Sequence, residues 1–251
     1  MIKLLKKICG LLGFKLVDKN LIKNDRLISK YSCRKIYNLL EKLFSENLIN
    51  TVIQIGANDG KRFDVLNKFI KKYLPRTILV EPIIKNFEDL KLNYKNQQNI
   101  FFENAAISVD NDINFLYKVD DQKLNLYDEH IKGINSFSKE HLLKHGVSKS
   151  HIKKEDVNSI SFKELIKKHS INTLDLLMID AEGYDGNIVI DFLSKNPLRP
   201  LIIFEYLHIK SSVFSKLINL LNQKNFIFYK LEENIVCFPE ENKKLKFLSN
   251  L

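Results

Sequence analysis

The chain has 251 residues, 45% of them hydrophobic, which suits one large folded domain with or without an appended piece. Lys and Arg (40) exceed Asp and Glu (30) by ten, but the lysines are scattered in pairs and no RNA- or DNA-binding motif is present, so a nucleic-acid partner is not expected. No segment approaches the ~20 apolar residues that span a bilayer, and Cys9, Cys33 and Cys237 lack metal-type spacing, so we expect a cytoplasmic protein in a reducing compartment.

Residues 1–48 are rich in lysine and predict an N-terminal helical cap ahead of a main domain at 49–251. The first sixteen residues have an amphipathic pattern, with lysines opposite an apolar face made of Met1, Leu4, Leu5, Ile8, Leu11 and Leu12. Lysines inside this run, and the lack of a small-residue cleavage site, argue against a signal peptide. Three docking places stay open for such a helix: its own domain, another subunit of a homo-oligomer, or the inner membrane surface in a peripheral contact.

From residue 51 onward, short apolar runs alternate with amphipathic ones. The runs predict strands at 51–55, 77–81, 100–103, 174–180, 201–206, 226–231 and 234–238. Helical patterns lie between them at 61–73, 84–96, 161–170, 186–196 and 211–224. This repetition predicts an α/β fold, a parallel sheet with helices on both faces. Only Glu232 and Glu233 separate the last two strands, so these must form an antiparallel hairpin.

The regular alternation fails in an insertion at about 112–160. Residues 112–119 predict an extra strand, and 134–162 predict a polar loop, a short helix and a strand. An insertion of this size in a regular sheet is more often a functional loop or lid than a connection without a function. We therefore expect the insertion, together with the N-terminal helices, to form the pocket for a substrate.

Polar and small residues follow the first three strands, where ligands of open parallel sheets bind. Gly56 and Gly60 flank a turn in which the first lets a ligand approach the backbone and the second permits a positive φ, before a helix expected to begin near Lys61. Glu81 ends the second strand and suits a bidentate grip on ribose hydroxyls. Asn104 and the small residues after it could border a purine ring.

Four segments, residues 53–60, 80–108, 134–138 and 174–189, resemble in order and spacing the FkbM family of S-adenosylmethionine-dependent methyltransferases. The resemblance is strongest at Ile179-Asp180-Ala181-Glu182-Gly183-Tyr184-Asp185. It implies a Rossmann-like, seven-stranded class I methyltransferase sheet whose last strand is antiparallel, in agreement with the hairpin deduced above. It also assigns nine positions to the cofactor: the methionine moiety to Gly56, Ala57, Asn58 and Gly60, the ribose to Glu81 and Pro82, the adenine edge to Asn104 and Ala105, and a nearby place to Ser136.

Carboxylates crowd the end of the fourth strand, where Asp180 and Glu182 follow four apolar residues. Methyl transfer to an alcohol requires a nearby group that takes the hydroxyl proton, or a metal that promotes its loss. Asp180, Glu182 and Glu205 are the candidates for base, or else for Mg²⁺ ligands, and His208 is an alternative base. Asp185 either takes part or caps a helix expected near Asn187. No ligand spacing with cysteine is found for His130, His141, His145, His151 and His169.

The leading hypothesis is an O-methyltransferase that acts on a hydroxyl of a sugar, a glycan or a sugar-containing natural product, the acceptor class that the family resemblance implies. A lipid-linked acceptor would give the basic N-terminal helix a use. One alternative is a methyltransferase-like scaffold without activity. The presence of the glycine turn, Glu81, Asp180 and Glu182 argues against it, because inactive members of such folds lose cofactor residues first. Methylation of RNA is a further alternative, encouraged by the net charge of +10 and discouraged by the absence of an Asn/Asp-Pro-Pro-aromatic motif.

Overall fold

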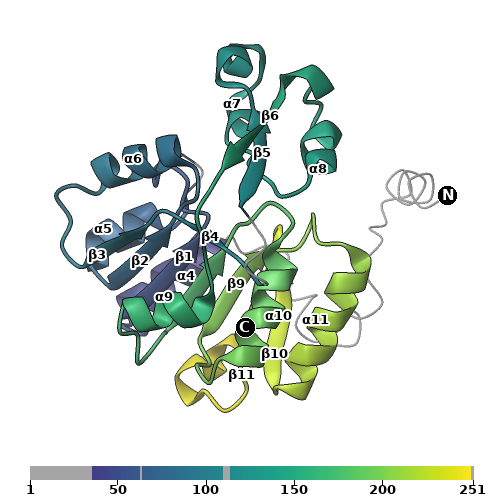
Figure 1. Cartoon of the computed structure of the whole chain (residues 1–251). Coiled ribbons are helices and arrows are strands. Elements are labelled where there is room, and N and C mark those ends of the chain that lie inside the picture. The colour runs from purple at the N-terminus through teal and green to yellow at the C-terminus, as the bar shows by residue number, and fades with distance from the viewer. Residues whose placement is uncertain (1–35, 63, 110–113, 250–251) are drawn as a thin grey trace.

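The computed structural model describes residues 36–62, 64–109 and 114–249 (Figure 1). The predicted amphipathic helix at 1–16 lies outside these ranges, as does the predicted cap up to residue 35. The part of the cap that is described contains helix α4 (Ile36–Ser45), which buries Leu39, Leu40, Leu43 and Phe44 on one side. In the described ranges, no helix combines the length and the apolar character needed to cross a membrane. The domain boundary at residue 48 stays a prediction.

A seven-stranded sheet forms the centre of the molecule, in the order β10-β11-β9-β8-β1-β2-β3. Its strands are β1 (Thr51–Ile55), β2 (Arg76–Val80), β3 (Ile100–Glu103), β8 (Leu176–Ile179), β9 (Leu201–Glu205), β10 (Phe226–Leu231) and β11 (Asn234–Pro239). The pairs among β3, β2, β1, β8 and β9 are all parallel, whereas β11 runs antiparallel to both β9 and β10. The predicted seven strands and the antiparallel last strand are confirmed.

Helices cover both faces of this sheet because its strands are apolar on both sides. On β1, Ile53 and Ile55 pack into a core with α9 (Phe162–Lys168), α10 (Asp185–Lys195) and α11 (Ser211–Gln223). Val52 points to the other face, where α4, α5 (Asn67–Tyr73), α6 (Ile84–Asn93) and the 3-10 helix η3 (Lys243–Ser249) supply the core. Successive side chains of one strand therefore pack into two cores, one on each face of the sheet, as the continuous apolar runs predict.

One predicted helix start is wrong. The helix expected from Lys61 begins at Asn67 as α5. The Asp59 side chain accepts hydrogen bonds from the backbone N–H groups of Lys61 (2.9 Å) and Arg62 (2.8 Å), which fixes a non-helical turn. The loop after β1 is therefore longer than predicted, and it has room for additional polar side chains at the end of the sheet.

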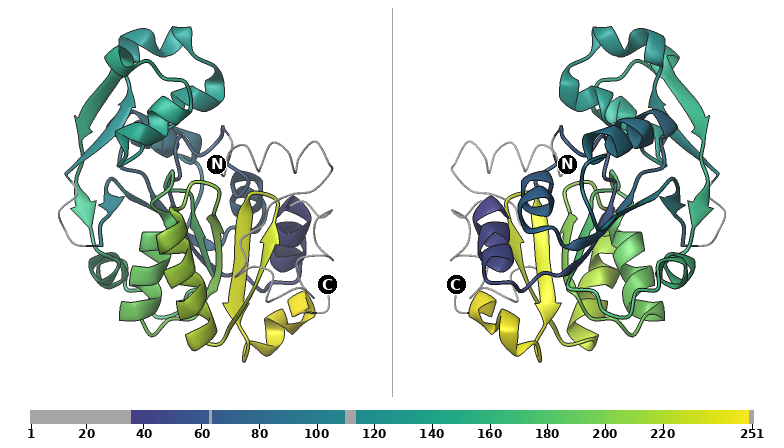
Figure 2. Two further views of the ribbon diagram at one scale, coloured as in Figure 1. Left: turned by 90° about the vertical axis from the view of Figure 1, so that its right-hand side faces the viewer. Right: turned by 90° about the vertical axis from the view of Figure 1, so that its left-hand side faces the viewer.

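The insertion forms a small lobe with its own core. Its elements are β5 (Phe115–Val119), η1 (Asp121–Leu126), α7 (Glu129–Lys132), α8 (Lys139–Lys144), η2 (Lys149–His151) and β6 (Ile152–Asp156). Strands β5 and β6 pair antiparallel, and Val119, Ile134, Leu142 and Val147 are buried together. Short strands β4 (Ala106–Ile107) and β7 (Ser159–Ile160) join the lobe to the main body. Both views of Figure 2 show the lobe beyond one end of the sheet and not against either face.

Candidate functional site

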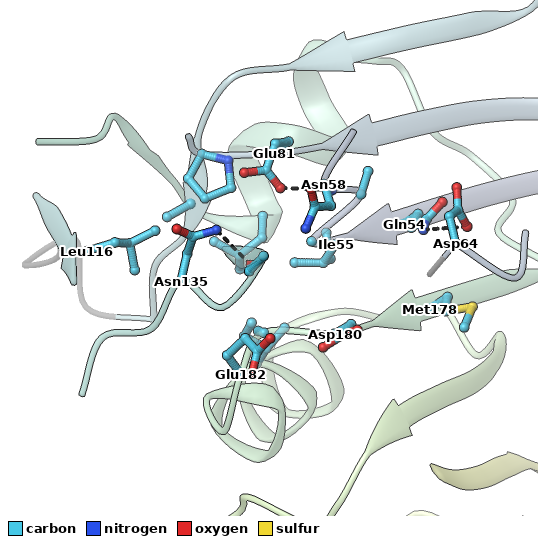
Figure 3. A pocket seen from close by; sticks show the side chains of 18 of the residues that line it. Gln54, Ile55, Asn58, Asp64, Glu81, Leu116, Asn135, Met178, Asp180 and Glu182 are labelled. Atoms are coloured by element: carbon cyan, nitrogen blue, oxygen red, sulfur yellow. Dashed lines mark hydrogen bonds between the residues drawn. The ribbon is translucent and has the colours of Figure 1, made fainter. Parts of the chain in front are cut away.

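A pocket opens at the carboxyl ends of β1, β2 and β8, facing the lobe. It contains about 920 Å³ of space free of protein atoms, its open mouth included. The strand order reverses at β1, which has β2 on one side and β8 on the other, and ligands of open α/β sheets bind at such a point. From the lobe, Leu116, Gly133, Asn135 and Phe137 complete the lining. Figure 3 shows Glu81 and Asp180 on opposite sides of this space.

Gly56 is required by the closeness of two backbones. It has a φ of +76°, and a Cβ built on it would lie 1.9 Å from the carbonyl oxygen of Asp180. The loop after β1 therefore packs directly on the loop after β8, and no side chain fits between them. Sequence reasoning assigned this glycine to ligand access, whereas the structure shows that contact with Asp180 already demands it. Gly56, Ala57 and Asn58 line the pocket, and Gly60 does not.

Glu81 is a buried carboxylate at the tip of β2, with 4% of its surface exposed. Its Oε2 accepts the backbone N–H of Asn58 (2.9 Å) and its Oε1 that of Ile83 (2.9 Å). Burial raises the pKa of Glu81 to about 7, the two N–H donors lower it, and the nearby charge of Asp180 raises it further. The carboxylate is thus held in one orientation at the pocket wall and retains lone pairs for a ligand.

Four further predicted cofactor positions fall into two groups. Pro82 and Ala105 line the pocket. Asn104 does not: its side-chain amide donates to the carbonyls of Glu81 (2.9 Å) and Pro82 (3.1 Å), so it joins the ends of β2 and β3. Ser136 is buried beside the pocket lining, and its hydroxyl donates to the carbonyl of Glu182 (2.9 Å). Direct contact of Asn104 and Ser136 with a cofactor stays a prediction.

The two acids of the loop after β8 both line the pocket. The side chain of Asp180 is accessible from the pocket, yet the surrounding protein displaces bulk water, and this raises its pKa. Burial and the charge of Asp180 raise the pKa of Glu182 to about 8. Glu182 adopts a positive φ of +49°, and its Oε2 lies 2.9 Å from Nε2 of His141. Glu182 thus lines the pocket and also contacts the lobe through His141.

Asp185 has a different place from these acids. Helix α10 begins at Asp185 itself and not near Asn187. Asp185 is fully buried, and its two carboxylate oxygens accept the N–H groups of Ala181 (3.1 Å) and Gly183 (3.1 Å). Burial and the charge of Asp180 raise its pKa well above the usual value. The capping alternative is wrong, because no side chain caps α10 and Asp185 is its first residue; Asp185 instead holds the turn that presents Asp180 and Glu182.

Glu205 and His208 lie outside the pocket lining, next to Glu182. Burial, followed by the charge of Asp180, raises the pKa of Glu205 to about 9. Burial and the neighbouring rings of His141 and His145 lower the pKa of His208 to about 4. Among the described residues, the one group of three metal-ligating side chains with ligand atoms within 4.8 Å of one another is His141, His145 and His208. The three acids predicted as alternative Mg²⁺ ligands form no such group, and that use stays a prediction.

Sequence reasoning missed four polar residues of the pocket, Gln54, Arg62, Asp64 and Asn135. Gln54 is an inward residue of β1, and its amide donates to Oδ1 of Asp64 (3.1 Å), while its own Oε1 has no hydrogen-bond partner among the described residues. Asp64 lies in the segment predicted as helix, and burial raises its pKa. A glutamine within an apolar strand, next to the glycine turn, was the available signal for this part of the site.

The pocket is acidic although the protein is basic. Its lining includes four carboxylates, Asp64, Glu81, Asp180 and Glu182, and one cation, Arg62. Arg62 is already paired with Asp59 (2.6 Å) and Glu129 (3.1 Å). Carboxylates crowded without matching cations raise one another's pKa values, and a positively charged ligand relieves that repulsion. The site therefore suits a small ligand that carries positive charge and hydroxyl groups.

Comparison with known proteins places this geometry in a family. The sequence model of the methyltransferase FkbM domain matches residues 54–228, which is more than half of the chain. This range includes both the pocket and the lobe. A search of curated proteins found no match.

Several solved structures are similar at low identity. A METTL16 methyltransferase domain has a TM-score of 0.45 and 11% identity, over 80% of this chain and 65% of that one. A caffeoyl-CoA O-methyltransferase from Staphylococcus aureus, described as putative, has a TM-score of 0.43 and 10% identity, over 95% of this chain and 91% of that one. Fibrillarin from Methanococcus jannaschii has a TM-score of 0.39 and 9% identity, over 75% of this chain and 65% of that one. The chain thus spans 65% of these METTL16 and fibrillarin chains, and no substrate follows from likenesses this low.

Proposed function

The chain belongs to the methyltransferase FkbM domain family, and from that premise we propose that it moves a methyl group from S-adenosylmethionine to a hydroxyl of a sugar, a glycan or a sugar-containing natural product. It is a methyltransferase of the S-adenosylmethionine-dependent class. The observation that carries the proposal is the acidic pocket at the reversal of strand order, with Glu81 buried in its wall.

The residues present suit this cofactor, whose sulfonium and ammonium groups outweigh its one carboxylate in charge. Glu81 would accept the ribose hydroxyls through lone pairs that its two backbone donors leave open. Pro82 and Ala105 offer apolar contact for the adenine ring beside it. At the other end, the unpartnered Oε1 of Gln54 and the carboxylate of Asp64 would accept hydrogen bonds from the ammonium group.

The chain's own part in the chemistry is to orient the acceptor and remove its proton. When bound, S-adenosylmethionine supplies an electrophilic methyl group on positively charged sulfur. Transfer to a hydroxyl forms a carbon–oxygen bond as the carbon–sulfur bond breaks, and one proton must leave the acceptor oxygen. The carboxylates of Asp180 and Glu182 would take it, and their position in the pocket lining supports this role. Glu205 and His208 lie outside the lining and would act only on an acceptor that reaches past Glu182.

The sugar acceptor is supported by the family resemblance and by the lobe, which closes the pocket with side chains such as Asn135 and Phe137. A lipid-linked acceptor and peripheral contact through residues 1–16 are part of the same proposal. Deletion of residues 1–16 would then abolish membrane association while activity on a soluble acceptor is intact. Unchanged partitioning between membrane and supernatant would contradict this part alone.

The experiment is methyl transfer from labelled S-adenosylmethionine to a panel of sugars, polyhydroxylated natural products and RNA, with and without Mg²⁺. We expect label in a hydroxyl-bearing sugar compound and a large loss of rate in Asp180→Asn. Label in RNA alone would replace the proposal by its RNA alternative, with binding that weakens as salt rises. No transfer to any acceptor by a protein that binds the cofactor would overturn the acceptor class, and no cofactor binding would favour a scaffold.

A further inference from the structure

Three histidines come together where the lobe meets the loop after β9. His141 lies on α8, and His145 is the residue that follows its last turn, with its backbone N–H donating to the carbonyl of His141 (3.3 Å). His208 follows β9 in a turn before α11. Their ring centroids are 4.5 Å (His141 to His208), 4.6 Å (His141 to His145) and 5.0 Å (His145 to His208) apart. One ligand nitrogen from each ring lies within 4.8 Å of the other two.

We propose that His141, His145 and His208 form a binding site for a divalent transition-metal ion of the Zn²⁺ class. Two histidines at positions i and i+4 of a helix share one face, which is how a helix offers two imidazoles to one metal. A third imidazole from a distant segment gives the three-histidine set of catalytic zinc sites, in which a fourth position is open. Imidazole nitrogen favours zinc and its first-row neighbours, whereas Mg²⁺ prefers oxygen.

Carboxylates stand beside two of the three rings. Oε2 of Glu182 lies 2.9 Å from Nε2 of His141, and Oε1 of Glu205 lies 3.5 Å from Nε2 of His208. A histidine that donates one ring N–H to a carboxylate presents its other nitrogen as a lone pair, and this pairing orients metal-bound histidines in proteins. His141 is buried and the other two rings are half-buried, so the cluster is shielded and yet accessible to an ion.

The histidine cluster lies close enough to the cofactor pocket for a bound metal to take part in the proposed reaction. Glu182 contacts His141 and also lines the cofactor pocket, so an ion held by the histidines would lie one side chain away from the place of methyl transfer. An acceptor hydroxyl that reached past Glu182 to the open position on the ion would have its pKa lowered. This role rests on the proposed function, whereas binding of the ion does not.

The test uses the full chain after treatment with a chelator. It is titrated calorimetrically with Zn²⁺, Co²⁺ and Mg²⁺, and bound Co²⁺ is followed by its visible absorption. The variants are His145→Gln and His208→Gln, and the matched control is His151→Gln, a lobe histidine outside the cluster whose ring bonds to the hydroxyl of Tyr127 (2.7 Å). Circular dichroism verifies that every variant is folded. Metal binding is measured without the cofactor, so a protein that fails to bind S-adenosylmethionine can still pass or fail this test.

We expect one equivalent of Zn²⁺ or Co²⁺ to bind to the wild type and to His151→Gln. Removal of a residue that only hydrogen-bonds to a metal ligand lowers metal affinity roughly 10- to 100-fold. Removal of a ligand itself should lower it more, so both cluster variants should bind the ion at least about a hundredfold more weakly. Equal binding by all four proteins, no binding by the wild type, or Mg²⁺ bound as tightly as Zn²⁺ would overturn the proposal.

Discussion

At Gly56 the end of β1 passes so close to the loop after β8 that a single methyl group is excluded. Gly56→Ala would place a Cβ 1.9 Å from the Asp180 carbonyl oxygen, at a φ of +76°. We expect a loss of about 3–5 kcal/mol in the free energy of unfolding, measured by urea denaturation. Gly146→Ala is the matched control, since its φ is +84° but nothing lies within 4 Å, and it should lose about 1–2 kcal/mol. Similar losses in both variants would contradict the close approach.

Glu81 should make cofactor affinity depend on pH. Burial raises its pKa to about 7, and the ionised carboxylate accepts hydrogen bonds from hydroxyl groups more strongly than the protonated acid does. Protonation as pH falls through 7 therefore weakens binding, and a group with a pKa near 7 predicts about tenfold lower affinity at pH 6 than at pH 8. Calorimetry with S-adenosylhomocysteine measures this ratio. In Glu81→Gln the affinity should be low and should change little between the two pH values. A wild-type affinity that does not change with pH would exclude Glu81 as the hydrogen-bond acceptor for the cofactor.

Single residues of the site were predictable where chemistry follows a strand end. Glu81 and Asp180 stand at the tips of β2 and β8, and both line the pocket, as that rule implies. Asn104 follows the same rule in sequence, and Ser136 was assigned by the family resemblance, but both side chains donate to backbone carbonyls. Which polar group faces the ligand and which one holds the loops depends on side-chain direction, and spacing along the chain does not fix it.

At the level of elements, the lobe is fastened to the loop after β8. The Ser136 hydroxyl donates to the carbonyl of Glu182, and the rings of Phe137 and Tyr184 meet edge to face at 4.6 Å. Ser136→Ala should cost about 1 kcal/mol, because it leaves a partly buried carbonyl without its donor. Faster hydrogen exchange in residues 180–184 would report the loosened loop. Ser138→Ala, which loses an exposed bond to Glu140, is the control, and equal exchange in both variants would refute the fastening role.

The main sheet was predictable from the sequence because its strands are long apolar runs and the link of Glu232 and Glu233 admits only a hairpin. The start of α5 was not, since Asp59 competes for the N–H groups that a helix would use. The lobe was predicted as an insertion, but the pairing of β4 with β7 was not. Strands of two residues are fixed by tertiary packing and carry no period of their own.

For the whole molecule, the pocket joins the sheet to the lobe, so a ligand that fills it should stabilise both together. At a concentration of 100 times its Kd, S-adenosylhomocysteine would add about 2.7 kcal/mol to the free energy of unfolding. For a chain of this size that corresponds to a rise in Tm of roughly 5–10 °C. Differential scanning calorimetry should show one transition that moves as a unit. A shift confined to one of two separate transitions would show that the lobe does not share the site.

The most direct measurement is calorimetric titration of the protein with S-adenosylmethionine and S-adenosylhomocysteine, beside Glu81→Ala. Family membership and the acidic pocket predict micromolar, one-to-one binding of both compounds by the wild type. Glu81→Ala, in which the ribose acceptor is missing, should bind neither at the same concentrations. Equal binding by the variant would place the cofactor elsewhere, and a folded wild-type protein that binds neither compound would contradict its assignment as an active methyltransferase.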